Sequence, residues 1–244
     1  MKETHFFDFN YQRGLQWYAD RFGHSAGDRP IGEICSYFPS PKATARIAEH
    51  IPDCKIICSL REPVERTYSS YKHAVYSGRA RGSLEEAIAQ FPYLTRENRY
   101  GLHLNRWYEQ FGKERVLVVL FDDLRDRPQA LIDQVCGFIG VEPIDLASVT
   151  LPAKAINSHP LVPRIPALAR KARRAINWLK DRELGWVNDS LERAGFWSLF
   201  FAGKFPPIKC ETERRLRERF LPEIEALEKL IGRSLPSWKV PRQT

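Results

Sequence analysis

The chain has 244 residues, of which 43% are hydrophobic and 28% charged, so its composition suits one large globular domain and excludes intrinsic disorder. Its net charge of +8 predicts an anionic partner, which could be a nucleotide, a sulfated or phosphorylated glycan, a nucleic acid or a membrane surface. No stretch approaches the roughly 18 apolar residues of a membrane-spanning helix.

The first part of the chain predicts two helices that lead into a buried strand. Residues 11–22 carry an apolar stripe at helical spacing, which consists of Tyr11, Leu15, Tyr18 and Phe22. Ser40 followed by Pro41 predicts the N-cap and first turn of a second helix. Residues 55–60, KIICSL, then predict a strand buried on both faces, because most of its residues are apolar without strict alternation.

Pro63 opens a third helix directly after this strand, since its fixed φ and missing N–H suit a first helical turn. Ser83 and Glu86 form a capping box that predicts another short helix. Helices over residues 100–111 and 128–138 enclose a second buried strand over residues 116–121. This alternation of strands and helices predicts an α/β fold with a parallel sheet and right-handed crossovers.

The composition shifts between residues 144 and 202 towards proline, basic residues and tryptophan, which predicts a variable insertion. Residues 164–182 predict a basic amphipathic helix. Its basic face could meet an acidic glycan or an anionic membrane, or could simply be solvated while the apolar face packs on the core. Its arginines and lysines match no groove-reading motif, so no nucleic-acid partner is expected. From residue 211 onward we expect structural helices, interrupted by Pro222 and closed by Gly232.

The junction between the strand at 55–60 and the helix that follows predicts an anion site. An anion above this turn would meet the guanidinium of Arg61, backbone N–H groups of the first helical turn and the hydroxyl of Ser69. Alternatively, Arg61 pairs with a nearby carboxylate and the segment is only structural.

The spacing of Arg61 and Ser69 within LREPVERTYSS resembles the 3′-phosphate-binding signature of sulfotransferases that use 3′-phosphoadenosine 5′-phosphosulfate (PAPS). Residues 2–18, KETHFFDFNYQRGLQWY, look like the segment after the phosphosulfate loop of heparan sulfate N- and 3-O-sulfotransferases and their bacterial relatives. Residues 99–143 and 203–238 are similar to segments that come later in the sequences of the same enzymes. The resemblance implies one sulfotransferase domain over residues 1–244, with a P-loop-NTPase-like three-layer fold whose central parallel sheet is flanked by helices.

The resemblance also implies roles for individual residues. Catalysis would fall to Glu3 as the base and to His5, acceptor binding to Asp8, and nucleotide binding to Arg61, Ser69 and Lys204. If this first segment is extended, Glu3 and His5 point to the same side and could reach one acceptor oxygen. The neighbouring Phe6 and Phe7 are expected in the core.

The activity implied is transfer of a sulfuryl group from PAPS to a hydroxyl or amine of a carbohydrate or glycolipid-like acceptor, without a metal. The alternative is a degenerate homologue that binds nucleotide or glycan without turnover, because the sequence contains no Lys-x-Gly-Thr-Thr-type phosphosulfate loop. We expect that loop and a first strand to be encoded upstream of residue 1. Residues 32–37, GEICSY, stand where 3-O-sulfotransferases have a functional lysine, so the acceptor cation is absent or has moved.

The cysteines and histidines predict a compartment but no metal site. The five cysteines form no Cys-x-x-Cys pair, and Cys58 and Cys136 lie inside apolar runs, which favours a reducing cytoplasm. The six histidines lack the spacing typical of metal ligands. The partners that the resemblance implies are a nucleotide and a carbohydrate or glycolipid-like acceptor. A peripheral membrane contact through residues 164–182 is left open.

Overall fold

The computed structural model describes residues 3–23, 30–149, 161–163 and 201–240, which fall into two compact units. The first unit holds the described residues of Met1–Glu62, Arg99–Thr150 and Pro222–Leu235. The second holds those of Pro63–Asn98, Leu151–Leu221 and Pro236–Thr244. The predicted basic helix at 164–182 lies outside the described residues.

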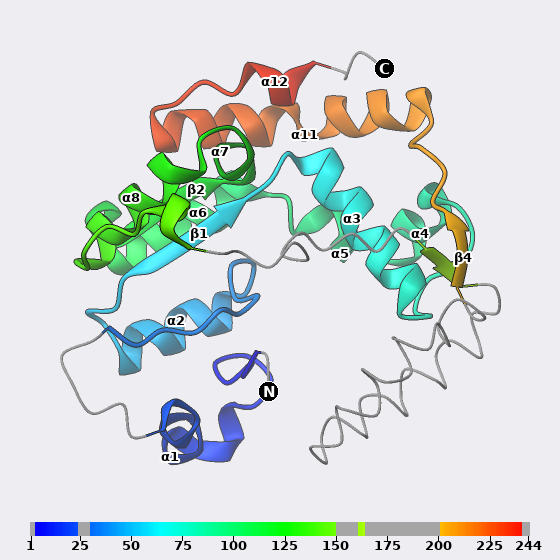
Figure 1. Cartoon of the computed structure of the whole chain (residues 1–244). Coiled ribbons are helices and arrows are strands. Elements are labelled where there is room, and N and C mark those ends of the chain that lie inside the picture. The colour runs from blue at the N-terminus through cyan, green and yellow to red at the C-terminus, as the bar shows by residue number, and fades with distance from the viewer. Residues whose placement is uncertain (1–2, 24–29, 150–160, 164–200, 241–244) are drawn as a thin grey trace. The chain divides into compact units, whose positions relative to one another are not determined.

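A parallel pair of strands forms the centre of the first unit (Figure 1). Strand β1 (Ile56–Leu60) pairs with β2 (Val116–Leu120) in a register that places Leu60 beside Leu120. Helices α6 (Tyr100–Phe111), α7 (Phe121–Asp126) and α8 (Pro128–Ile139) contact β2. Both predicted strands and the α/β fold with a parallel sheet flanked by helices are thus confirmed.

Strand β1 differs from the prediction in its burial. Cys58 and Leu60 are buried, whereas Ile57 is 41% exposed and Ser59 is exposed as well. Successive side chains of a strand point to opposite faces, so only the face of Cys58 and Leu60 is covered by described residues. The expectation of two buried faces is wrong for this part of the chain.

The helices of the first unit follow their local signals. Helix α2 (Pro41–His50) begins as predicted, with the Ser40 hydroxyl accepting from the backbone N–H of Ala43 at 3.2 Å. Helix α6 buries an apolar stripe, which consists of Tyr100, Leu104, Trp107 and Phe111. The Trp107 indole donates to the carbonyl of Phe38 at 3.0 Å.

The predicted helix over residues 11–22 is divided into three short elements. These are η1 (Tyr11–Arg13), α1 (Gly14–Ala19) and η2 (Asp20–Phe22). Gly14, with φ of 82°, ends η1 in a conformation that ordinary residues avoid and so interrupts the helix. Leu15 is 47% exposed and takes no part in a buried stripe.

The second unit contains the helix that follows β1. Helices α3 (Pro63–Tyr76), α4 (Leu84–Gln90) and α5 (Tyr93–Arg96) contact one another, and the capping box of Ser83 and Glu86 at the start of α4 is confirmed. The buried Asn98 amide donates to the Thr67 hydroxyl at 2.7 Å, which ties α3 to the end of α5. Strands β3 (Leu161–Pro163) and β4 (Phe201–Lys204) pair antiparallel.

Helix α11 (Cys210–Ile231) corrects the expectation of an interruption at Pro222, because it continues through that residue. Gly232, with φ of 64°, follows its end as predicted. The short helix α12 (Pro236–Lys239) comes next. Among the described residues, no helix combines the length and apolarity that crossing a membrane requires.

Candidate active site

A tight turn near the start of the described chain carries three of the predicted site residues. The backbone N–H groups of Phe9 and Asn10 donate to the carbonyl of His5 at 3.1 and 2.9 Å. His5 has φ of 47°, in the left-handed region that few residues other than glycine adopt, although histidine, asparagine and aspartate are enriched there. The segment is therefore not extended, so the condition under which the sequence placed Glu3 and His5 on one side is not met.

This turn nevertheless gathers the predicted side chains. The Nε2 atom of His5 lies 3.2 Å from Oε2 of Glu3, and its Nδ1 atom lies 3.2 Å from Oδ2 of Asp8. The side chains of Glu3 and His5 are each 31% exposed, whereas that of Asp8 is 12% exposed. A solute can therefore reach the carboxylate and the imidazole, while Asp8 supports the ring from below the surface.

Aromatic packing explains why the segment turns. Phe6 and Phe7 are 0% and 1% exposed, as predicted for core residues. Two consecutive side chains that both enter the core are incompatible with a regular strand, where neighbours point to opposite faces. The Phe6 ring stacks on Tyr18 at 4.7 Å, and Phe7 meets Tyr37 edge-on at 5.9 Å.

Hydrogen bonds to neighbouring segments hold the turn in place. The Thr4 hydroxyl donates to Glu33 at 2.7 Å, and the Phe7 N–H donates to the Tyr37 phenol at 3.3 Å. Arg46 donates to the carbonyl of Phe7 at 2.9 Å. Burial raises the pKa of the Tyr37 phenol, so this group stays protonated at neutral pH. The turn is thus attached to the segment at residues 33–37 and to α2.

Two residues that the sequence did not indicate complete this cluster. Sγ of Cys35 lies 3.5 Å from Nδ1 of His5, and the Ser36 hydroxyl donates to Oε2 of Glu3 at 3.2 Å. Burial raises the pKa of the Cys35 thiol. Both residues belong to GEICSY, which the sequence marked only as lacking the family's lysine, and no local spacing connects this segment to a turn about 30 positions earlier.

Arg61 stands where the two parallel strands end. Leu60 and Leu120 are partners in the last pair of the register, and Arg61 and Phe121 are the next residues of each strand. The Arg61 guanidinium lies over the Phe121 ring at 4.8 Å, and its carbonyl accepts from the Tyr100 phenol at 2.7 Å. Burial lowers the pKa of this arginine, which still stays protonated. In open α/β sheets, ligands bind outside this carboxyl edge.

The remaining predicted nucleotide contacts belong to the second unit. Ser69 lies half-buried in the middle of α3. Lys204 is the last residue of β4, where its backbone pairs with Leu161. The structure thus brings Glu3, His5 and Asp8 together, and it holds Arg61 in the first unit and Ser69 and Lys204 in the second.

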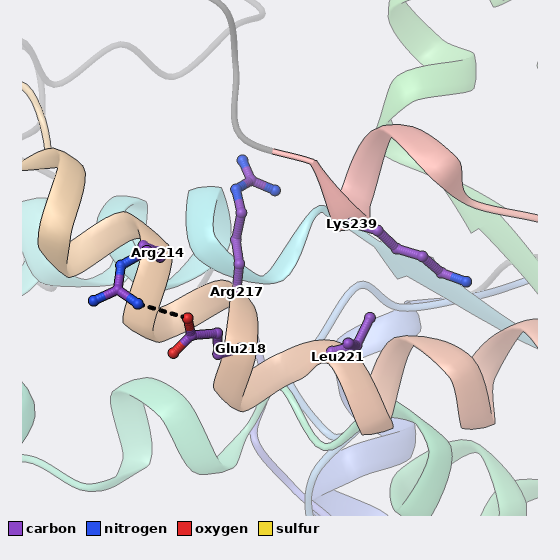
Figure 2. A pocket seen from close by; sticks show the side chains of 5 residues that line it. All are labelled: Arg214, Arg217, Glu218, Leu221 and Lys239. Carbon is purple, nitrogen blue, oxygen red and sulfur yellow. Dashed lines mark hydrogen bonds and ion pairs between the residues drawn. The ribbon is translucent and has the colours of Figure 1, made fainter.

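A small pocket in the second unit involves none of the predicted site residues. It has a volume of about 160 Å³ and is lined by Arg214, Arg217, Glu218, Leu221 and Lys239. Figure 2 shows the first four residues on α11 and Lys239 on α12, with an ion pair of 2.9 Å between Arg214 and Glu218. Arg217 is 7% exposed and donates to the carbonyl of Trp238 at 3.0 Å, so it acts as a structural connection between these helices.

A model of the "Sulfotransferase family" matches residues 5–145. The chain is 29% identical over 166 residues to the bifunctional heparan sulfate N-deacetylase/N-sulfotransferase 4 of Mus musculus, and 30% identical over 159 residues to the heparan sulfate glucosamine 3-O-sulfotransferase 3B1 of Homo sapiens. Each match covers 58% of this chain, but only 18% of the first relative and 39% of the second.

The fold also has a solved counterpart. A sulfotransferase from Alicyclobacillus acidocaldarius superimposes with a TM-score of 0.69, over 98% of this chain and 87% of that chain. The two sequences are 22% identical, so this likeness concerns the fold.

Proposed function

This chain belongs to the sulfotransferase family, and from that membership we propose that it transfers a sulfuryl group from PAPS to a hydroxyl or amine of a carbohydrate or glycolipid-like acceptor. The observation that carries the proposal is the turn that sets the Glu3 carboxylate 3.2 Å from the His5 imidazole, with Asp8 on the opposite ring nitrogen. The relatives named for heparan sulfate support a carbohydrate acceptor.

Glu3 is the proposed general base. Its carboxylate is accessible, and the Ser36 hydroxyl holds one of its oxygens in place. The acceptor loses a proton during transfer, and a carboxylate within hydrogen-bonding reach of the acceptor atom can take that proton. His5, held by Asp8, would orient the acceptor against this carboxylate.

Arg61 is the proposed ligand of the 3′-phosphate of PAPS, with Ser69 and Lys204 as further nucleotide contacts. Its guanidinium is half-buried, packed on Phe121, and placed at the carboxyl edge of the parallel strands. A planar cation held in this way fits a phosphate group, because it offers paired N–H donors with little conformational freedom to lose. PAPS, when bound, supplies the activated sulfuryl group.

Calorimetry with adenosine 3′,5′-bisphosphate and with 5′-AMP tests the phosphate contact. We expect the bisphosphate to bind more tightly, and Arg61→Ala to abolish this preference at a cost of about 1.5–3 kcal/mol, or roughly ten- to hundredfold in affinity. Arg115→Ala is the control, because Arg115 is 43% exposed and pairs with Asp53. Equal affinity of the unchanged chain for both nucleotides would contradict the proposal.

The same preparation tests turnover and separates the enzyme from the alternative of a non-catalytic homologue. That alternative is favoured by one observation, the absence of a Lys-x-Gly-Thr-Thr-type loop in the 244 residues. We expect Glu3→Gln to lower transfer by roughly 10²–10⁴-fold while the bisphosphate affinity stays unchanged. The exposed Glu49→Gln serves as the control. Tight bisphosphate binding without transfer to any glycan tested would support the binding protein.

A further inference from the structure

The imidazole of His5 lies between two carboxylates in an arrangement that a neutral ring cannot satisfy. Glu3 faces its Nε2 atom at 3.2 Å and Asp8 faces its Nδ1 atom at 3.2 Å. Carboxylates only accept hydrogen bonds, and a neutral imidazole has one N–H, so one of the two contacts lacks a donor. A second proton on the ring, or a cation beside it, removes this conflict.

The thiol of Cys35 adds a third type of metal ligand at the same place. One ligand atom each from Glu3, His5 and Cys35 can be chosen so that all lie within 4.8 Å of one another. A zinc ion bound to sulfur and nitrogen at about 2.3 and 2.0 Å holds its ligand atoms roughly 3–4 Å apart, so small side-chain movements would suffice.

We propose that Glu3, His5 and Cys35 form a binding site for a divalent ion of the zinc class. Thiolate, imidazole and carboxylate together favour zinc over magnesium or calcium, which prefer oxygen ligands alone. Three protein ligands leave a fourth position for water, as in open zinc sites. Binding converts the Cys35 thiol to a thiolate and releases its proton to solvent.

The surroundings of the three ligands fit this role. Sγ of Cys35 lies 3.5 Å from Nδ1 of His5, so the thiol has to turn towards Nε2 for an ion to bind between that nitrogen and Glu3. Nδ1 then remains to donate to Asp8, which is the usual outer contact of a metal-binding histidine. The Ser36 hydroxyl likewise orients Glu3. The side chains of Glu3 and His5 are 31% exposed, so an ion can reach them from solvent.

Metal binding has a consequence that rests on the proposed function. An ion held by Glu3 occupies the carboxylate that would accept the acceptor's proton, so zinc binding and sulfuryl transfer exclude each other. Zinc would then act as a reversible inhibitor of the enzyme, competing with the acceptor and not with the nucleotide.

Cobalt(II) is the probe for the site, added to the full chain after treatment with a chelator. We expect one cobalt per chain, a near-ultraviolet thiolate-to-cobalt band and visible bands of tetrahedral cobalt, all of which one equivalent of zinc removes. Cys35→Ser should lose the thiolate band and weaken binding at least about tenfold. His5→Asn should weaken binding likewise, and asparagine tolerates the left-handed backbone at this position.

Cys54→Ser is the matched control, because Cys54 is also a half-buried free thiol and is not one of the three ligands. It should keep the bands and the affinity, and circular dichroism should show all variants folded. The site is refuted if the unchanged chain shows no thiolate band, if the band survives in Cys35→Ser, or if Cys54→Ser removes it. A chain with this cobalt signature that shows no transfer after the metal has been removed refutes the enzyme alone, and one with transfer but no signature refutes the metal site alone.

Discussion

Asp123 is the residue whose charge contributes most clearly to the stability of the first unit. Its side chain is 12% exposed and accepts from Arg127 at 2.6 Å and from Arg233 at 2.8 Å, which ties α7 to the segment after α11. The hydrogen bond from Arg233, opposed by burial and helped by Arg127, lowers the pKa of Asp123 from 3.8 to about 2. The folded state therefore prefers the ionised carboxylate.

The sign of the resulting pH dependence follows from proton binding. The unfolded chain binds a proton at Asp123 more readily than the folded chain does, so the contribution is complete above pH 3.8 and is lost as the pH falls towards 2. We expect Asp123 to contribute about 2 kcal/mol at neutral pH. In denaturant unfolding, Asp123→Asn should have a free energy of unfolding lower by this amount at pH 7. Its free energy of unfolding should also fall less steeply in acid than that of the unchanged chain. The exposed Asp133→Asn should behave like the unchanged chain. If the free energy of unfolding falls with pH in parallel in the unchanged chain and in both variants, Asp123 does not have this role.

At the scale of single elements, two glycines within helices differ in how closely they are packed. At one a substitution would test close packing, and at the other it would test helix propensity. Gly101 is buried in α6, and a Cβ atom there would lie 2.8 Å from Cβ of Ala226 in the part of α11 that belongs to the same unit. Gly137 in α8 is exposed, and a Cβ atom there would meet no atom within 4 Å. The same substitution should therefore have opposite effects at the two positions.

We expect Gly101→Ala to lower the free energy of unfolding by about 1–3 kcal/mol, because two helices would have to move apart. Gly137→Ala should raise it by about 0.5–1 kcal/mol, because alanine loses less conformational entropy in a helix. Chemical denaturation of both variants checks these values. If Gly101→Ala were as stable as Gly137→Ala, α6 and this part of α11 would not be in close contact.

At the scale of the whole molecule, the proposal of one domain over residues 1–244 awaits a test of cooperativity. The chain passes repeatedly between the two compact units, and α11 continues as one helix through the boundary at Leu221 and Pro222. A single helix that runs through both units couples their unfolding. We expect one thermal transition with equal calorimetric and van't Hoff enthalpies. Two separate transitions would instead indicate two domains.

The cytoplasmic location and the role of residues 144–202 stay predictions.

Local sequence was enough to assign the family and to predict those helices and strands whose signals lie within a few neighbouring residues. Ser40 with Pro41, and Ser83 with Glu86, set helix starts through hydrogen bonds within a single turn, so their effect can be read locally. The runs of apolar residues likewise predicted both parallel strands, although they could not show that one face of β1 is exposed.

The shape of the candidate active site, in contrast, depends on tertiary packing. The left-handed turn at His5 results from burying Phe6 and Phe7 together, and it brings Glu3 and Asp8 to the same ring. Cys35 reaches that ring across 30 positions of the chain. Such contacts arise from the packing of distant segments, for which the local sequence holds no spacing rule, and they decide which chemical groups can act on one substrate or one ion.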